Sequence, residues 1–139
     1  MGTFGTGPFD SDGALDLLDD LAARPADSRA DVLAALLGRP IADPDSIGRE
    51  VFADEVVAAV AVVASGLAGR RAGEPWWDEV AGKAAAVLPI PDLIRLVPAA
   101  TAVLAIVAEP WGRDWTSPDD AVAAEETARR LAEVLSAAG

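Results

Sequence analysis

Five aspartates near the start of the chain form the densest group of side chains that could do chemistry. They are Asp10, Asp12, Asp16, Asp19 and Asp20. Carboxylates gathered in this way can ligate a hard cation, cap the first turn of a helix, or present a negative surface to a basic protein. The cation site has a strict pattern to meet, whereas the other two roles do not.

The spacing around Gly13 fits a calcium-binding loop poorly. If Gly13 holds the invariant glycine position of such a loop, the first ligand falls on Pro8, which has no side-chain oxygen. The last ligand falls on Asp19, which is shorter than the usual Glu. We therefore favour capping of the first helix by Asp10 or Asp12, together with a solvated acidic face. A weak cation site made by the first three of the five aspartates is the alternative.

The residue types missing from the chain narrow its chemistry. It contains no Cys, no His and no Tyr. Without Cys there are no disulfides and no thiolate metal sites, and without His the commonest general base and metal ligand is absent. Catalytic arrangements built on Ser-His or Cys-His pairs are thereby excluded. These absences favour a protein that is not an enzyme, and we assign no catalytic residue, no metal ligand and no cofactor.

The formal net charge of −12 restricts the partners that the chain can have. A surface this acidic repels nucleic acid and anionic membranes, so we expect neither as a partner. The same field attracts basic proteins and speeds their encounter. Residues 1–55 hold 12 acidic residues and four arginines and so carry a net charge of −8. A basic protein partner is therefore expected on the N-terminal part.

Neither a secretory leader nor a membrane span is predicted. The start lacks a basic segment followed by an apolar one. The longest apolar runs, 56–64 and 102–108, fall short of the roughly 20 residues of a spanning helix. Arginines far outnumber the single lysine, which is typical of a GC-rich bacterial genome. We expect a bacterial, cytoplasmic protein; its oligomeric state stays open, including self-assembly through apolar helices.

Four tryptophans could build an aromatic pocket or anchor a partner protein. They are Trp76, Trp77, Trp111 and Trp115. Tryptophan is also an ordinary packing residue at the wet edge of a helical core, and we favour this interpretation. Because Trp76 and Trp77 are adjacent, they point about 100° apart on a helix. They cannot face the core equally, and the one that faces it less is the better candidate for an exposed anchor.

The apolar pattern predicts an all-α fold, a compact single domain over residues 1–139 with about five to seven helices in a bundle. Helices are expected from Asp10 or Asp12 to Arg24 and over 27–37, 47–68, 75–88, 92–97, 98–108 and 118 onward, with a loop at 109–115. Prolines and glycines set most of these ends. Leu15, Leu18 and Leu21 are expected on the buried face of the first helix, with Leu17 as a further candidate. The helix over 47–68, with Phe52 in its stripe, is apolar nearly all round and is expected at the centre.

An ordered arm, residues 1–12, precedes the first helix. Its distinctive residues are three glycines and two phenylalanines, Gly2, Gly5, Gly7, Phe4 and Phe9. The glycines permit backbone conformations that other residues avoid, so the arm cannot be helical throughout. The phenylalanines are expected to pin it into grooves between helices. A phosphate-binding loop is excluded, because no strand precedes the segment and no lysine lies within it.

The opening segment resembles the start of a bacterial family, the domain-of-unknown-function family 4259. Members begin Gly-x-Trp-Gly-x-Gly-x-Phe-(Asp/Glu)-Asn-Asp-x-Ala, and the matching residues are Gly2, Gly5, Gly7, Phe9, Asp10, Asp12 and Ala14. Phe4 stands where the family has Trp, and Ser11 where it has Asn. The resemblance implies a small all-helical domain whose signature lies in the first sixteen residues. It implies no activity, because the family has none established.

These observations favour a non-enzymatic, acidic protein-interaction domain. Its aspartates would bind a basic protein, for example a toxin that a small acidic antidote neutralises. The alternative is a protein that binds a cation or a small molecule through the N-terminal aspartates. Strong salt dependence of partner binding would favour the first hypothesis. A shift in melting temperature with divalent cations or metabolites would favour the second.

Overall fold

The computed structural model describes residues 6–67, 74–113, 115 and 117–138, and within these ranges every regular element is a helix. The α-helices are α1 (Asp12–Ala23), α2 (Ala26–Ala42), α3 (Ala53–Leu67), α4 (Pro75–Ala84), α5 (Val97–Arg113) and α6 (Pro118–Ala138). Three 3-10 helices join them: η1 (Pro44–Ser46), η3 (Ala85–Val87) and η4 (Leu93–Leu96). The prediction of an all-α bundle of about five to seven helices is confirmed.

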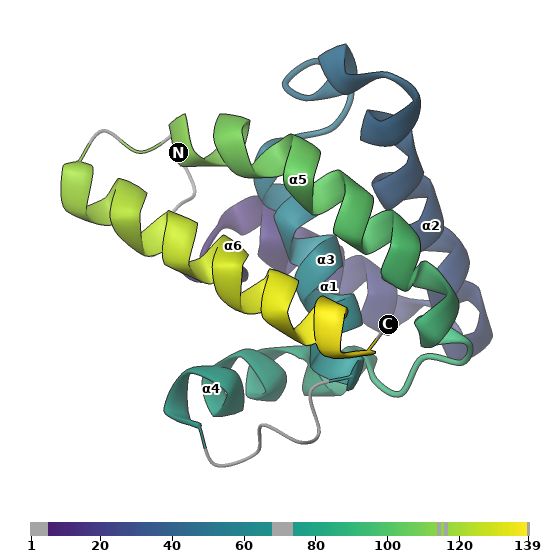
Figure 1. Cartoon of the computed structure of the whole chain (residues 1–139). Coiled ribbons are helices and arrows are strands. Elements are labelled where there is room, and N and C mark those ends of the chain that lie inside the picture. The colour runs from purple at the N-terminus through teal and green to yellow at the C-terminus, as the bar shows by residue number, and fades with distance from the viewer. Residues whose placement is uncertain (1–5, 68–73, 114, 116, 139) are drawn as a thin grey trace.

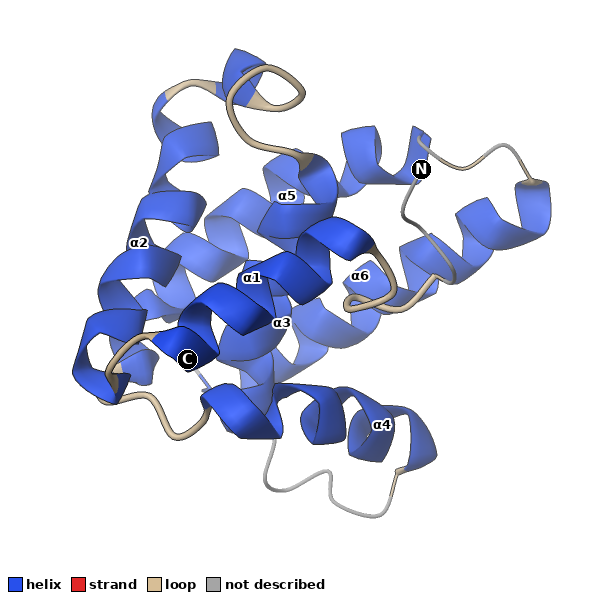
Figure 2. Ribbon diagram, turned by 180° about the vertical axis from the view of Figure 1, so that it is seen from behind, coloured by secondary structure: helices blue, strands red, loops and turns tan. Residues whose placement is uncertain are grey.

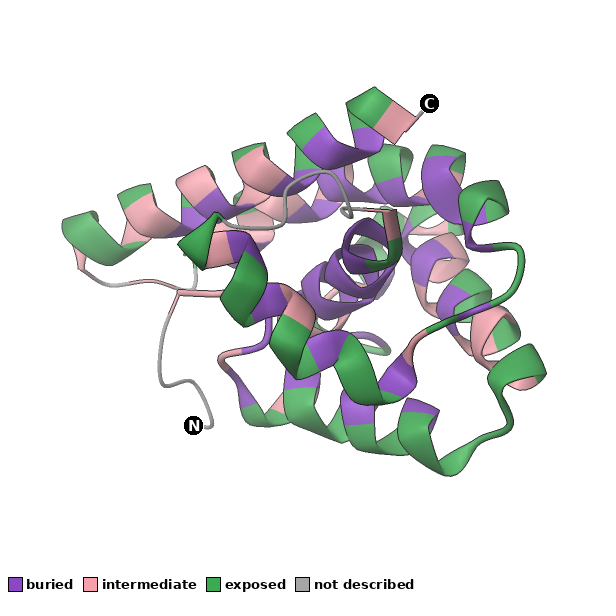
Figure 3. Cartoon of the chain, turned by 90° about the horizontal axis from the view of Figure 1, so that it is seen from below, coloured by how far each residue is buried: buried purple, intermediate pink, exposed green. Residues whose placement is uncertain are grey.

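Helix α3 is the centre of the bundle, as its apolar sequence predicted. Every residue from Val56 to Ala64 is fully buried. Valine and alanine have no side-chain polar group that needs water, and the small alanines allow close approach of neighbouring helices. Helices α1, α2, α4, α5 and α6 all pack on α3. Figure 1 shows α5 and α6 in front of it and Figure 2 shows α1 crossing its other side. In Figure 3 the buried α3 is ringed by helices that are buried on one side only.

Helix α3 begins later than the sequence predicted. Residues 47–52 belong to a loop in which the Ser46 carbonyl accepts hydrogen bonds from the three amides of residues 49–51, at 2.9–3.2 Å. The Glu55 carboxylate then accepts a hydrogen bond from the Phe52 amide at 3.3 Å, which satisfies a donor at the helix start. Phe52 therefore lies outside the helix and is 57% exposed, so its predicted place in the buried stripe is wrong.

Ser11 caps α1, which corrects the predicted cap at Asp10 or Asp12. The Ser11 Oγ accepts a hydrogen bond from the Ala14 amide at 3.1 Å, and Ser11 has extended backbone dihedrals. Asp12 is already the first helical residue, and the Asp10 carboxylate turns back toward the arm. Serine and asparagine are both strong caps, so Ser11 does here what an Asn would do.

The buried stripe of α1 contains Leu18 and Leu21, as predicted, and Leu17, the further candidate, in place of Leu15. Its buried residues are Ala14, Leu17, Leu18 and Leu21. Leu15, predicted to face the core, is 38% exposed instead. Gly13 lies against Asp54 of α3, since a Cβ built at Gly13 would be 2.5 Å from the Asp54 Oδ2. The N-terminal end of α1 therefore presses on α3 through Gly13 and Ala14, which turns Leu15 outward.

The carbonyl end of α1 is closed by Arg29 of α2. Its Nε donates to the Leu21 carbonyl at 2.7 Å, and its Nη1 donates to the Val87 carbonyl of η3 at 3.0 Å. Carbonyls at a helix end have no partner within the helix, and a cation there also suits the helix dipole. Arg29 thus joins α1, α2 and η3 through one guanidinium group.

Two prolines lie inside helices that they were predicted to end. Pro40 was expected to stop the second helix, yet α2 continues to Ala42, and Pro40 is buried. Pro110 was expected in a loop, yet α5 continues to Arg113, and Trp111 is buried at 5% exposure. A proline removes one backbone hydrogen bond, and near a helix C-terminus this cost is offset by packing of the residues around it. By contrast, the predicted starts at Pro75 and Pro118 are confirmed.

Candidate functional site

The described part of the arm, residues 6–11, forms a tight turn on the surface of the bundle. The Gly7 amide donates to the Asp10 Oδ2 at 3.0 Å, and the Asp10 amide donates to the Gly7 carbonyl at 3.3 Å. A Cβ at Gly7 would lie 2.7 Å from the same Oδ2, so glycine lets the carboxylate close on the backbone. Of the predicted motif residues, Gly2, Phe4 and Gly5 lie outside the described residues.

Phe9 fastens this turn to the bundle. Its side chain is 1% exposed and belongs to the hydrophobic core, as the arm prediction required. On the side of α6, the Thr127 Oγ1 donates to the Thr6 carbonyl at 3.0 Å. Together with α1, which follows directly, these contacts hold the arm at both of its described ends.

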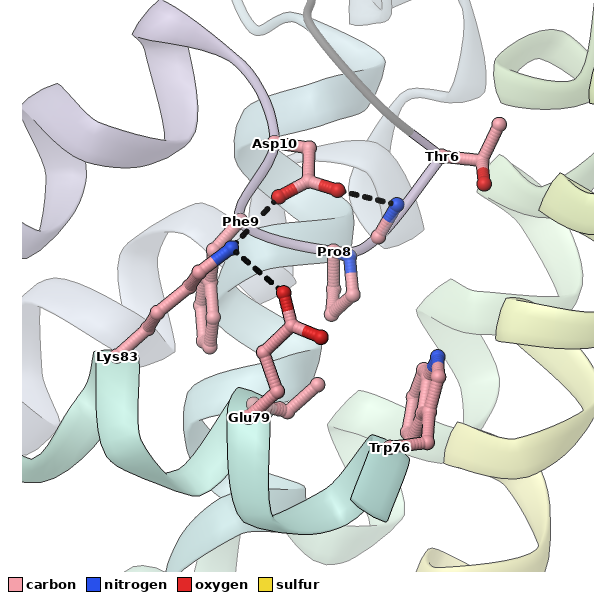
Figure 4. A pocket seen from close by; sticks show the side chains of 9 residues that line it. Thr6, Pro8, Phe9, Asp10, Trp76, Glu79 and Lys83 are labelled. Atoms are coloured by element: carbon pink, nitrogen blue, oxygen red, sulfur yellow. Dashed lines mark hydrogen bonds and ion pairs between the residues drawn. The ribbon is translucent and has the colours of Figure 1, made fainter.

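Lys83 of α4 ties the arm to a third helix (Figure 4). Its Nζ lies 2.8 Å from the Asp10 Oδ1 and 3.4 Å from the Glu79 Oε1. The hydrogen bond that Lys83 donates to the Asp10 carboxylate, with the attraction of both carboxylates, raises the pKa of Lys83 above its ordinary value, although partial burial opposes the shift. Lys83 is therefore a firmly protonated cation and not an amine nucleophile.

The tryptophans form two edge-to-face pairs on either side of the arm. The Trp76 and Trp77 ring centroids are 4.8 Å apart, and those of Trp111 and Trp115 are 6.1 Å apart. Trp77 and Trp111 are buried and serve packing, while Trp76 and Trp115 are half-buried. The expectation that Trp76 and Trp77 face the core unequally is confirmed, and Trp76 is the more exposed.

A cavity of about 210 Å³ lies between the arm and α4, with Trp76, Glu79 and Lys83 in its wall. Arg130 of α6 places its guanidinium 5.2 Å from the Trp76 ring centroid. Figure 4 shows Pro8 and Glu79 across the cavity from the Trp76 ring. Pockets that bury drug-sized ligands measure about 300–1,000 Å³, so this one suits a single side chain or a very small molecule. On the other side of the arm, a much smaller cavity touches Trp111 and Trp115.

The five predicted aspartates are not brought together into one site. Asp10 is engaged by the arm and Lys83, whereas Asp12, Asp16, Asp19 and Asp20 are exposed on α1. Within the described ranges, no group of three or more carboxylates is placed to hold a metal ion. The cation-site alternative, in which Asp10, Asp12 and Asp16 share one ion, therefore has no geometric support there.

The exposed aspartates form an acidic face on α1 instead. Asp12, Asp16 and Asp19 follow one another at helical spacing, so they share one side of the helix. Asp20 is held by Arg24, whose Nε lies 3.1 Å from its Oδ2. Among the residues that the structure describes, no basic side chain forms an ion pair with the other three. We call these three residues the α1 acidic face.

A model of a protein family, described as a domain of unknown function (DUF4259), matches residues 2–137. The chain belongs to this family. The match extends over nearly the whole DUF4259 chain and confirms the resemblance predicted from its first sixteen residues. No curated protein matches the chain. No solved structure matches it either.

Several residues of this DUF4259 site were not predicted from the sequence. Lys83 and Thr127 bond to the arm and Glu79 pairs with Lys83, but all three lie far from the arm in the chain, and no local spacing connects them with Asp10. One usable signal existed, since Lys83 is the only lysine among many arginines. The short flexible ammonium fits between two carboxylates where a planar guanidinium would need more room.

Proposed function

We propose that this DUF4259 domain is a non-enzymatic, bacterial and cytoplasmic interaction protein whose α1 acidic face receives a basic protein. The observation that carries the proposal is the exposure of Asp12, Asp16 and Asp19 on one side of α1 without a basic neighbour in the described ranges. Other exposed acids, such as Glu126, are already neutralised by arginines of their own helix. Unpaired charge on one helix face is available to an incoming partner and accelerates its encounter.

The composition supports the same function. The formal net charge is −12, and the chain has neither His nor Cys for the commonest catalytic roles. Attraction to a basic partner is screened over about 10 Å at 0.1 M salt, so binding is expected to fall steeply with added salt. A basic toxin that an acidic antidote neutralises is one example of a partner with the required positive charge.

A capture experiment with two charge-matched variants tests this function. The variant D12N/D16N/D19N removes three charges from the α1 acidic face, and D27N/D31N/D119N removes three exposed charges from α2 and α6. Each protein is immobilised and incubated with a lysate of the source organism at 50–500 mM salt, about the range over which screening changes most. We expect a basic protein to be retained by the native chain and the second variant, and lost by the first.

Two results would contradict the proposal. Equal loss with both variants would mean that only the overall charge attracts the captured protein. Equal retention by both would mean that the partner binds another surface.

The cavity beside the arm favours a small molecule as the second candidate ligand. Its wall combines the Trp76 ring with the Lys83 ammonium and the carboxylates of Asp10 and Glu79, which together offer apolar and charged contacts to a very small polar molecule. A thermal-shift screen with small polar metabolites tests it. Because binding to the folded state raises the melting temperature, a shift that W76A abolishes would support this site. No shift with any compound would remove it.

A further inference from the structure

The outward side of α5 is an uncharged surface that no other element covers among the residues that the structure describes. Its exposed residues are Pro98, Thr101, Ala102 and Ala105, and Ile94 of η4 precedes them at 53% exposure. No charged residue occurs between Arg95 and Glu109. Figure 1 shows α5 crossing the front of the molecule with nothing over it, and Figure 2 shows it on the far side. We call these five exposed residues the α5 outer face.

This surface is unusual for so apolar a helix. Residues Leu93–Arg113 are long and apolar enough, by length and composition, to cross a membrane, but only 39% of an 18-residue window within that stretch is buried. The inner side packs on α2, α3 and α6. A helix that is apolar on all sides normally has both sides covered. The α5 outer face is therefore apolar enough to be covered by another surface, yet no described element covers it.

Charged residues at the two ends of this surface follow a self-complementary order. Asp92 and Arg95 stand at one end, and Glu109 and Arg113 at the other, and their side chains are 70%, 79%, 81% and 71% exposed. The pairs within each end are loose, at 3.9 Å and 4.0 Å. All four can therefore turn toward groups outside the molecule.

The midpoint of Arg95 and Glu109 is Ala102, which lies on the outer face. The midpoint of Asp92 and Arg113 falls between Ala102 and Val103, almost the same place. A second copy turned antiparallel about Ala102 would set each of these charges opposite a charge of the other sign. A parallel copy would set like charges against each other. The ends are about 21 Å apart along the helix, so the four ion pairs would frame the uncharged centre.

We propose that α5 packs antiparallel against α5 of a second copy of this chain, about a two-fold axis at Ala102. The small side chain at the axis lets the two helices approach closely, and the same patch serves both copies, as an isologous interface requires. The chain as a whole is strongly acidic, but the four end residues sum to no net charge, so this is a surface where two copies can meet.

The strength of the dimer is limited by its size. One helix pair buries less than the roughly 1,200 Å² of a stable interface, so we expect a micromolar dimer that dissociates on dilution. Salt is expected to strengthen the dimer, because screening reduces the long-range repulsion between two acidic chains more than the attraction within the close ion pairs. Binding of a basic protein to the α1 acidic face responds to salt in the opposite sense, so failure of either proposal is recognised separately.

Sedimentation equilibrium over a wide range of protein concentrations tests the dimer. We expect the mass of two chains at high concentration for the native protein. The variant A102E, which sets two carboxylates against each other at the axis, is expected to weaken dimerisation at least about tenfold. The matched control A132E changes an exposed alanine of α6 and is expected to leave it unchanged. Unaltered circular dichroism of both variants shows that they fold.

Charge exchange tests the antiparallel register. The variants R95E and E109R each create like-charge contacts and are expected to dimerise several-fold more weakly than the native chain. Mixed together, they restore both ion pairs, so native mass spectrometry is expected to find heterodimers in excess of either homodimer.

Three outcomes would overturn the proposal. They are a single-chain mass at all concentrations, equal effects of A102E and A132E, and mixing without heterodimer enrichment. Co-sedimentation of the native chain, but not A102E, with phosphatidylcholine vesicles would assign the surface to a membrane instead.

Discussion

Truncation of Phe9 to alanine measures how firmly the arm is fastened to the bundle. The side chain is 1% exposed, and a buried aromatic ring removes about 150–250 Å² from water. At about 25 cal/mol per Å², losing most of that area is worth about 3–5 kcal/mol, in agreement with measured Phe truncations. Phe9 also borders the arm cavity, so water or movement of the arm can fill the space left behind. We therefore expect Phe9→Ala to lower the free energy of unfolding by about 3 kcal/mol, at the lower end of this range.

Urea unfolding followed by circular dichroism at 222 nm gives the free energy of unfolding. With a denaturant slope of about 2 kcal/mol/M, the expected loss lowers the midpoint by about 1.5 M. Phe52→Ala is the matched control, because it removes the same side chain at 57% exposure and is expected to change stability by less than about 0.5 kcal/mol. A loss below about 0.5 kcal/mol for Phe9→Ala would show that the ring is exposed in solution and the arm is free.

Three further changes test the local interactions. Ser11→Ala is expected to cost about 1 kcal/mol by removing the cap of α1, while Ser11→Asn retains it, as urea unfolding would show. Gly13→Ala is expected to change stability by less than about 1 kcal/mol, because displacing the Asp54 carboxylate, 2.5 Å from the new Cβ, offsets the gain in helix propensity. Lys83→Met is expected to cost less than about 1 kcal/mol near neutral pH, because the pair with Asp10 is partly exposed. Because the pKa of Lys83 is raised in the folded state, its contribution is full below the unfolded-state pKa and disappears as the pH rises above about 10.4.

Each of these changes has its own control. Gly38→Ala, at a helical position with open space around it, is expected to stabilise the protein by roughly 0.5–1 kcal/mol. Equal stabilisation by Gly13→Ala and Gly38→Ala would contradict the close contact between Gly13 and Asp54. If Lys83→Met and the native chain lost stability in parallel between pH 9 and pH 12, the ion pair would have no role. If Ser11→Asn were as harmful as Ser11→Ala, capping would not explain the position.

The helices could be predicted because local signals set most of them. The apolar run around Val60 identified the central helix, and Pro75 and Pro118 marked the starts of α4 and α6. The errors arose where packing overrides a local rule. Pro40 and Pro110 were expected to end helices, but α2 continues to Ala42 and α5 to Arg113, because packing of the buried Pro40 and Trp111 offsets the hydrogen bond that each proline removes.

The candidate site was predicted only in part, for a related reason. The arm and the exposure of Asp12, Asp16 and Asp19 follow from local sequence. The engagement of Asp10 does not, because its partner Lys83 is 73 residues away and is brought there by the packing of α4. A cluster of carboxylates in sequence was thus divided by the fold between an internal ion pair and an exposed surface.

The two tryptophan pairs beside the arm give the protein its own optical label. The chain has four tryptophans and no tyrosine, so its ultraviolet emission comes from tryptophan, and three of the four line the cavities beside the turn at Gly7 and Pro8. Departure of the arm would bring water to the half-buried Trp76 and Trp115 and shift the emission to longer wavelength. Attachment of the arm can therefore be followed in real time, in the unmodified chain, during partner binding, self-association or unfolding.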